Sequence, residues 1–393
     1  MSHAAVPPDI PGVLSALRRV LPSGPVALHE PEFGDAERRY LQDCLDTGWV
    51  SSVGAYVDRF EADLAAYTGA ARAVAVVNGT AALHICLKLV DVEPGDEVLI
   101  PALTFVATAN AVHYCGAVPH FVDCEISSLG LDAAKLDAYL GDLARLDGGA
   151  CRNRRTGARI RAVVPMHCFG HPVDMEGLLE VAARWRLEVV EDAAESLGSF
   201  RNGRHTGRFG RVAALSFNGN KILTTGGGGA ILTDDEALAQ RARHLTTTAR
   251  VAHRWSFVHD EVGYNYRLPN LNAALGCAQL ERLPEMLADK RRLAAAYAGA
   301  LEGVAGVRFV HEPPHCQSNY WLNGILLERA DTDARDALLE ASNADGIMTR
   351  PAWTLMHRLP MHAACPRMPL DCAEDIEARL INLPSSARLG RSL

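Results

Sequence analysis

Hydrophobic residues follow two alternating periods along the first two thirds of the chain. Short apolar runs, several rich in valine, are each followed by a longer segment in which apolar residues recur every three or four positions. The short runs predict strands at 73–77, 98–101, 117–122, 162–165, 187–191, 212–215 and 230–233, and the longer segments predict helices at 56–67, 81–90, 104–115, 175–186 and 236–245. This alternation predicts an α/β fold in which helices cover both faces of a mostly parallel sheet.

Outside this region the pattern is less regular. Residues 1–29 are a proline-rich lead-in with a short helix at 13–20, and another helix is expected at 35–45. Residues 131–161, which become basic towards their end, are predicted to be a solvated loop, and 253–270 a second loop.

The last third of the chain predicts a second, smaller unit. A long helix, or two helices separated near Pro284, is expected at 272–301. Strands at 307–310 and 321–326 and a helix at 332–343 follow. We therefore expect a large domain at 30–268 and a small domain at 269–393, which residues 1–29 join.

Composition excludes several classes of protein. The net charge of −8 argues against nucleic-acid and membrane-surface partners, which usually select a basic face. The ten cysteines show no zinc-like spacing, so they are expected to be reduced thiols, no metal is expected, and a cytoplasmic location follows. Neither a signal peptide nor an apolar run of roughly 18 residues is present.

One stretch carries the strongest chemical signal. The sequence SFNGNKILTTGGGG at 216–229 places Lys221 between a strand end that bears Ser216 and Asn218 and four consecutive glycines. Glycines let the main chain approach a ligand closely, and a serine hydroxyl with backbone amides favours a phosphate. Lys221 then either contributes a positive charge beside that phosphate or forms a covalent bond to the ligand through its amine.

Three other strand ends are expected at the same edge of the sheet. They carry Gly79 and Thr80 before a helix, Phe105 at a helix start, and Asp192 after an apolar run. Together with Lys221 they match the needs of pyridoxal phosphate, which requires a phosphate anchor, a stacking ring, a carboxylate for its ring nitrogen and an amine for its aldehyde. Each has an ordinary alternative, since Asp192 is also a suitable helix cap and Phe105 a suitable core residue.

At these residues the sequence resembles the DegT/StrS group of sugar-nucleotide aminotransferases. The resemblance runs from about residue 31 to the C-terminus and rests on motifs in a fixed order: G-W-V-S at 48–51, N-G-T-A-A-L at 78–83, P-A-L-T-F-V-A-T-A-N at 101–110, E-D-A-A-E-S at 191–196, S-F-N-G-N-K at 216–221, T-T-G-G-G-G at 224–229 and G-Y-N-Y-R at 263–267. It implies the aspartate-aminotransferase fold (pyridoxal-phosphate fold type I), with a mostly parallel seven-stranded sheet and a smaller α+β C-terminal domain.

The resemblance also implies roles for individual residues. Lys221 would bind pyridoxal phosphate covalently and shuttle protons, and a lysine at this position favours transamination over the dehydratase chemistry of relatives that carry histidine. Asp192 would pair with the ring nitrogen and Phe105 would stack on the ring, with Glu195 near the ring oxygen. The remaining cofactor contacts would come from Gly79, Thr80, Ala81, Ser216, Asn218 and, from the partner subunit of a homodimer, Asn265.

Within the group, further pieces resemble the branch that acts in legionaminic-acid and related pathways. They are L-H-E-P at 28–31, W-V-S-S-V-G at 49–54, H-C-F-G-H-P at 167–172, S-N-Y-W-L-N at 318–323 and T-R-P-A-W-T-L-M-H at 349–357. The implied reaction moves the amino group of L-glutamate to C4 of a UDP- or GDP-linked 4-keto-6-deoxy-N-acetylhexosamine. The implied substrate contacts are Trp49, Arg267, Tyr320, Arg350, Trp353 and His357.

Other functions stay open at this point. Another keto-sugar nucleotide, of the C3-keto or perosamine type, is the alternative substrate. A non-catalytic sensor of the same fold is disfavoured because no basic helix-turn-helix segment is visible. A nicotinamide-dependent oxidoreductase is disfavoured because no G-x-G-x-x-G follows the first strand.

Overall fold

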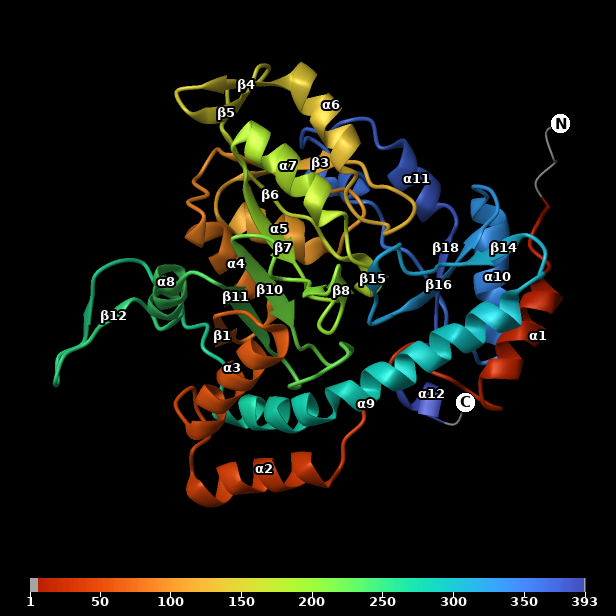
Figure 1. Cartoon of the computed structure of the whole chain (residues 1–393), viewed down its shortest axis with the longest axis horizontal. Coiled ribbons are helices and arrows are strands. Elements are labelled where there is room, and N and C mark those ends of the chain that lie inside the picture. The colour runs from red at the N-terminus through yellow and green to blue at the C-terminus, as the bar shows by residue number, and fades with distance from the viewer. Residues whose placement is uncertain (1–5, 392) are drawn as a thin grey trace.

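A seven-stranded sheet forms the centre of the computed structural model, which describes residues 6–391 and 393 (Figure 1). Its strands, in spatial order, are β1 (Arg72–Val76), β11 (Gly229–Thr233), β10 (Val212–Ser216), β7 (Glu188–Asp192), β6 (Ile160–Val163), β2 (Glu97–Pro101) and β3 (Val118–Val122). β11 runs antiparallel to both of its neighbours, and the other neighbouring pairs are parallel. The predicted mostly parallel α/β fold is confirmed.

Both faces of this sheet are buried, as the apolar runs require. In β1, Val74 and Val76 pack into the same cluster as α4 (Gly79–Leu89), whereas Ala73 and Ala75 pack on the other side with α3 (Ala55–Thr68) and α9 (Asn270–Leu301). Successive side chains of a strand point to opposite faces, so this division follows from the period of two. The other helices of this region are α2 (Asp35–Thr47), α5 (Val106–Tyr114), α6 (Ala133–Leu143), α7 (Met175–Trp185) and α8 (Glu236–Thr246).

The smaller part of the protein is built on a four-stranded antiparallel sheet. Its order is β14 (Val307–Phe309), β16 (Asn323–Leu327), β18 (Leu380–Leu383) and β17 (Arg350–Pro351). The helices of this part are α1 (Ile10–Val20), α10 (Thr332–Ala344), α11 (Asp371–Glu377) and α12 (Arg388–Arg391), with 3-10 turns η2 (Met356–Arg358) and η3 (Pro360–His362).

Helix α9 connects the two parts along one side of the molecule (Figure 1). Leu283 packs with the sheet-side cluster, and Leu293 and Tyr297 pack with the core of the smaller part. Of the two alternatives at 272–301, the single long helix is confirmed and the pair separated near Pro284 is not, because the helix continues through the proline with Leu283 and Met286 buried on either side. Since α9 belongs to both cores, the domain boundary after residue 268 stays a prediction; residues 1–5 of the lead-in lie outside the described residues.

The prediction of a solvated loop at 131–161 is also wrong. Helix α6 starts at the cap Asp132 and buries Leu136, Leu140 and Leu143, and the hairpin β4 (Ala144–Asp147) and β5 (Ala150–Asn153) follows. Gly148 and Gly149 form the turn between these strands, and both have positive φ, a conformation that glycine adopts without steric cost.

Short strands complete the structure. One ribbon consists of β15 (Cys316–Gln317), β8 (Phe200–Arg201) and β9 (Arg204–His205), and a 3-10 turn η1 lies at Cys168–Gly170. The pair β12 (Arg250–Val251) and β13 (Val258–His259) forms a hairpin that projects away from the body of the protein (Figure 1). Among the described residues, no helix has the length and apolar character required to cross a lipid bilayer.

Candidate active site

A cavity of about 320 Å³ lies at the carboxyl ends of the parallel strands. This is the edge at which ligands bind in open α/β sheets. The cavity is lined by Asn78, Gly79, Thr80, Leu83, Phe105, Ala107, Met166, Asp192, Ala194, Glu195, Ser216, Asn218, Asn220, Lys221, Trp321 and Trp353. All four strand-end features of the sequence therefore reach one cavity.

Lys221 projects into this cavity from the turn after β10. Its backbone N–H donates to the carbonyl of Asn218 at 2.9 Å, which fixes the turn. Its Nζ lies 3.0 Å from Oε1 of Glu195 and 3.7 Å from the ring centroid of Trp321. The amine is thus held between a carboxylate and an aromatic face, in a largely buried position.

Asp192 lies at the end of β7 and is fully enclosed. The hydroxyl of Thr108 donates to Oδ2 at 2.7 Å, and the N–H of Ala194 donates to Oδ1 at 3.2 Å. Burial raises the pKa of Asp192, although these two hydrogen bonds act in the opposite direction. A buried carboxylate without a close cationic partner among the described residues is suited to a protonated ring nitrogen of a ligand.

Glu195 is the second buried carboxylate of the site. Burial raises its pKa to about 7, and the charge of Lys221 partly opposes this shift. The N–H of Phe169 donates to Oε2 at 2.9 Å, so one oxygen is fixed by the main chain while the other faces Lys221. Glu195 can therefore gain or lose a proton near neutral pH.

The opposite end of the cavity has the features of an anion site. Gly79 and Thr80 begin α4, and the first N–H groups of a helix have no partner within the helix. A Cβ at Gly79 would lie 2.8 Å from Cβ of Ser216, so the close approach of the helix to β10 requires glycine. Ser216 and Asn218 complete this end. Ala81 does not line the cavity, because its N–H is used by the cap side chain of Asn78 at 2.7 Å.

Aromatic side chains form another wall of the cavity. Phe105 is the N-cap residue of α5 and is half exposed. Its ring lies 6.3 Å from that of Trp353, which in turn stacks on Phe169 at 4.7 Å with an interplanar angle of 26°. The position of Phe105 agrees with the stacking role that the resemblance implies.

These residues fit pyridoxal phosphate. The cavity offers an amine, an enclosed carboxylate, an aromatic ring and a helix N-terminus with a serine hydroxyl, which are the groups that this cofactor requires. Lys221 would hold the aldehyde carbon, Asp192 the ring nitrogen, and Gly79, Thr80 and Ser216 the phosphate. The bound cofactor supplies an electron-accepting ring, and the protein supplies orientation and the proton-carrying groups.

Several residues expected in the site lie elsewhere. Arg267 is buried in an ion pair with Glu61 at 2.8 Å and donates to the carbonyl of Ala75 at 2.9 Å, so it has a structural role in this subunit. The hydroxyl of Tyr320 accepts from the N–H of Glu312 at 3.2 Å. Neither residue lines the cavity, and no sequence pattern indicates these tertiary partners.

His357, Trp49 and Asn265 also lie outside the cavity lining. Nε2 of His357 is 3.3 Å from a carboxylate oxygen of Glu374. Trp49 is exposed, and Asn265 is exposed and bridged to Thr247. A contact of Asn265 with the cofactor therefore requires a second subunit and stays a prediction.

Arg350 lines a second cavity of about 470 Å³, which shares Asn220, Trp321 and Trp353 with the first. Trp353 therefore borders both spaces, as expected of a substrate contact, whereas Arg350 faces only the second. Its guanidinium donates to Asn343 at 3.1 Å and to the carbonyl of Thr349 at 2.8 Å.

Sequence reasoning missed two residues of the site. Trp321 contacts the amine of Lys221 and donates through Nε1 to the carbonyl of Asn220 at 2.7 Å. Thr108 holds Asp192. Both lie inside quoted motifs, at 318–323 and 101–110, but nothing in their spacing indicates which residue of a motif faces the ligand.

Comparisons with known proteins agree with this geometry. The sequence profile of the DegT/DnrJ/EryC1/StrS aminotransferase family matches residues 31–392. The GDP-perosamine synthase of Caulobacter vibrioides is 38% identical over 365 residues, which cover 93% of this chain and 94% of that protein. The GDP-perosamine synthase of Escherichia coli O157:H7 is 34% identical over 361 residues, 92% of this chain and 93% of that protein. The crystal structure of the aminotransferase TlmJ from Streptoalloteichus hindustanus superposes with a TM-score of 0.84 at 29% identity, covering 94% of this chain and 95% of that one.

Proposed function

This chain belongs to the DegT/DnrJ/EryC1/StrS aminotransferase family, and from that premise we propose that it transfers the amino group of L-glutamate to C4 of a GDP-linked 4-keto-6-deoxyhexose. Membership of this family shows that the chain is a pyridoxal-phosphate-dependent aminotransferase that acts on a sugar. The nucleotide, the sugar and the amino donor are the proposal.

One observation supports the reaction class most directly. Lys221 and Asp192 line the same cavity, one as an amine and the other as an enclosed carboxylate. In the proposed reaction Asp192 keeps the ring nitrogen of the cofactor protonated, and Lys221 moves the proton of the donor carbon as general base and general acid. Glu195, 3.0 Å from Nζ, is placed to accept or return the proton that Lys221 carries.

The relatives support the perosamine type of substrate. The two curated proteins described above, which match nearly the full chain, are named GDP-perosamine synthases. The resemblance to the legionaminic-acid branch favoured an N-acetylated hexosamine, with the perosamine type as the alternative. The relatives instead support the perosamine type. The experiment must therefore distinguish a GDP-linked 4-keto-6-deoxyhexose from an N-acetylhexosamine substrate.

We also propose that the enzyme acts as a homodimer with shared active sites. The hairpin of β12 and β13 projects from the subunit (Figure 1). Trp255 and Phe257 in its loop are 70% and 74% exposed, and Val262, shortly after β13, is 80% exposed. Large apolar side chains gathered on a projecting hairpin mark a surface that a partner covers. Asn265, which follows this hairpin and is exposed in its own subunit, is the residue we expect to reach the partner's cavity.

Paired substrates test the proposal. Purified enzyme with pyridoxal phosphate and L-glutamate is given GDP-4-keto-6-deoxymannose or the UDP-linked 4-keto-6-deoxy-N-acetylglucosamine, and products are measured by mass spectrometry. We expect the amino sugar from the GDP substrate with a kcat/KM at least about tenfold higher, a difference of about 1.4 kcal/mol. A preference for the UDP substrate would show that the proposed sugar nucleotide is wrong. If neither substrate were aminated, the proposed substrate class would be rejected.

A further inference from the structure

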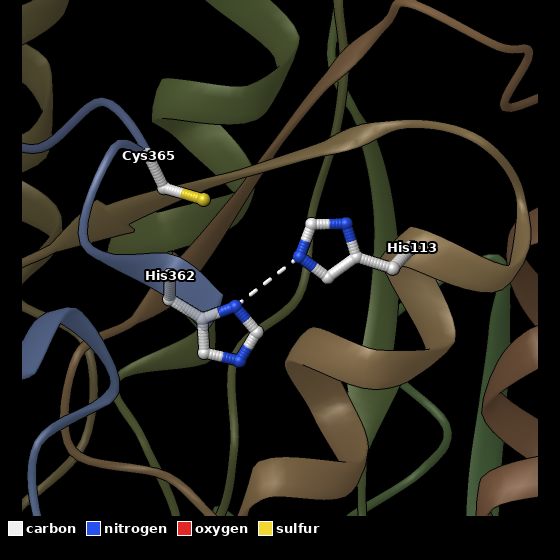
Figure 2. A group of neighbouring side chains, drawn as sticks. All are labelled: His113, His362 and Cys365. Atoms are coloured by element: carbon white, nitrogen blue, oxygen red, sulfur yellow. Dashed lines mark hydrogen bonds between the residues drawn. The ribbon is translucent and has the colours of Figure 1, made fainter. Parts of the chain in front are cut away.

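A cluster of nitrogen and sulfur side chains lies away from the active site. His113 is in the last turn of α5, His362 ends η3, and Cys365 follows three residues later (Figure 2). Nε2 of His113 and Nδ1 of His362 are 3.2 Å apart, and one ligand atom from each of the three residues lies within 4.8 Å of the others. None of the three lines the active-site cavity.

The backbone around this cluster is fixed. The N–H of Cys365 donates to the carbonyl of His362 at 3.0 Å, which closes the turn that places both side chains on one side. Beyond it, Phe121 of β3 donates to the carbonyl of Pro366 at 2.9 Å and accepts from Met368 at 3.1 Å. The segment that carries His362 and Cys365 is therefore attached to the edge of the large sheet, beside the end of α5.

We propose that His113, His362 and Cys365 bind a Zn²⁺ ion. Tetrahedral zinc with Zn–N bonds of about 2.0–2.1 Å separates two imidazole nitrogens by about 3.3 Å, close to the observed distance. The corresponding N–S separation is about 3.6 Å, so the sulfur of Cys365 must approach by no more than about 1 Å, which rotation of its side chain can supply. Water completes the coordination.

The chemistry of the ligands favours this metal. Two imidazoles and a thiolate are ligands that zinc prefers, whereas magnesium and calcium require oxygen. The nitrogens of His113 and His362 face each other within hydrogen-bond distance, so at least one of them carries a free electron pair. His362 is 0% exposed, and its other ring nitrogen has no hydrogen-bond partner among residues 6–391 and 393. Within that part of the chain, its one side-chain hydrogen bond is on the side that faces His113.

A second cluster of possible ligands does not share these features. His244, Asp260 and Glu261 are half-buried or exposed, and His244 already pairs with Asp260 at 2.7 Å. This cluster contains no sulfur ligand. It therefore serves as a control for metal binding at a site other than the proposed one.

The proposed ion would connect two distant segments of the chain. His113 comes from a helix on the large sheet, and His362 and Cys365 come from the C-terminal region. The site would therefore stabilise the attachment of residues 360–368 to β3, independently of amino transfer.

Cobalt substitution tests this proposal on the full-length, cofactor-bound enzyme. After treatment with a chelator, Co²⁺ is added and absorption is followed in the red region, where tetrahedral Co²⁺ absorbs and pyridoxal phosphate does not. We expect one tetrahedral Co²⁺ per chain, displaced by an equivalent of Zn²⁺. Zn²⁺ should also raise the melting temperature of the wild-type enzyme, because it binds only the folded state.

Two variants test the ligands. Cys365→Ser and His113→Ala should each lose the tetrahedral spectrum and weaken Zn²⁺ binding by at least about 100-fold, more than the loss of an outer partner of a metal ligand. His113 is exposed at a helix end, so its replacement leaves the fold intact. Cys316→Ser and His244→Gln are the matched controls and should bind as the wild type does. An octahedral spectrum, or binding and melting shifts that Cys365→Ser and His113→Ala leave unchanged, would overturn the proposal.

Discussion

The side-chain nitrogen of Lys221 lies 3.0 Å from Oε1 of Glu195, inside the cavity that both residues line. The carboxyl has a pKa of about 7 because burial penalises its charged form more than Lys221 stabilises it. The amine of Lys221 thus has a neighbour that changes its protonation state near neutral pH. This relationship links the chemistry of the site to a measurable dependence of stability on pH.

Replacing Glu195 by glutamine should change that dependence. Folding raises the pKa of Glu195 from 4.5 to about 7, so the folded protein binds this proton more tightly than the unfolded chain does. The free energy of unfolding therefore falls as the pH rises from 4.5 to 7. In cofactor-free protein, the free energy of unfolding of the wild type should fall between pH 4.5 and 7 by up to about 3 kcal/mol more than that of Glu195→Gln. Urea unfolding across this window measures the difference. Parallel profiles of the two proteins would show that folding leaves the pKa of Glu195 unchanged.

Asp192→Asn should reduce amino transfer strongly without unfolding the protein. Asparagine keeps the volume of the side chain and an acceptor for Thr108, but it carries no charge for the ring nitrogen of the cofactor. We expect kcat/KM to fall by about 10²- to 10³-fold, as for the loss of one preorganised electrostatic group. Thr108→Val removes the hydrogen bond to Oδ2, together with the 3.0 Å contact between the hydroxyls of Thr108 and Thr104, and should cost about tenfold. Wild-type activity in Asp192→Asn would exclude the proposed role.

Arg267 should affect stability more than substrate binding. Its guanidinium is buried against Glu61 and the carbonyl of Ala75, so Arg267→Met leaves the Glu61 carboxylate without this partner. Arg243 still pairs with Glu61, so we expect a loss of about 2 kcal/mol in the free energy of unfolding, the scale of a hydrogen bond to a charged group. The double variant Glu61→Gln with Arg267→Met should recover part of this loss. If Arg267→Met left the stability unchanged and raised the KM for the sugar nucleotide, Arg267 would instead be a substrate contact.

The hairpin of β12 and β13 should control the oligomeric state. Replacing Trp255 and Phe257 together by serine removes exposed apolar surface that we expect the partner subunit to cover. Sedimentation velocity should show the wild type as a dimer and this variant as largely monomeric at micromolar concentration. Leu146→Ser, on the exposed hairpin of β4 and β5, is the matched control and should remain dimeric. A monomeric wild type would contradict the proposed shared sites.

The sheet could be predicted because its strands are buried on both faces. Runs such as 98–101 and 212–215 are apolar throughout, and the ends of the runs at 187–191 and 212–215 indicated where Asp192 and Ser216 would lie. The helix at 133–143 was missed although Asp132 caps it and Leu136, Leu140 and Leu143 are spaced for one face, because the basic residues beyond it suggested a loop. The passage of α9 through Pro284 depends on burial on both sides of the proline, which a local rule does not include.

The candidate site was predictable only in part, for a different reason. Lys221, Asp192, Phe105 and Ser216 stand at strand and helix ends, so their convergence follows from the topology of the sheet. The partner of Arg267 lies about two hundred positions earlier in the sequence, and Trp321 meets Lys221 across one hundred residues. The Trp321 contact depends on how the smaller part packs on the larger one, and the Arg267–Glu61 pair depends on how the segment after β13 returns to α3. Hydrophobic periodicity specifies neither.

The attachment of the cofactor to Lys221 is the central claim, and one measurement tests it directly. The chain has four lysines, Lys88, Lys135, Lys221 and Lys290, so each can be followed separately. The enzyme is incubated with pyridoxal phosphate, reduced with borohydride, digested and analysed by mass spectrometry. We predict that the reduced cofactor is found on the peptide that contains Lys221 and on no other lysine peptide. Labelling of a different lysine, or of none in an enzyme that transfers amino groups, would contradict the account.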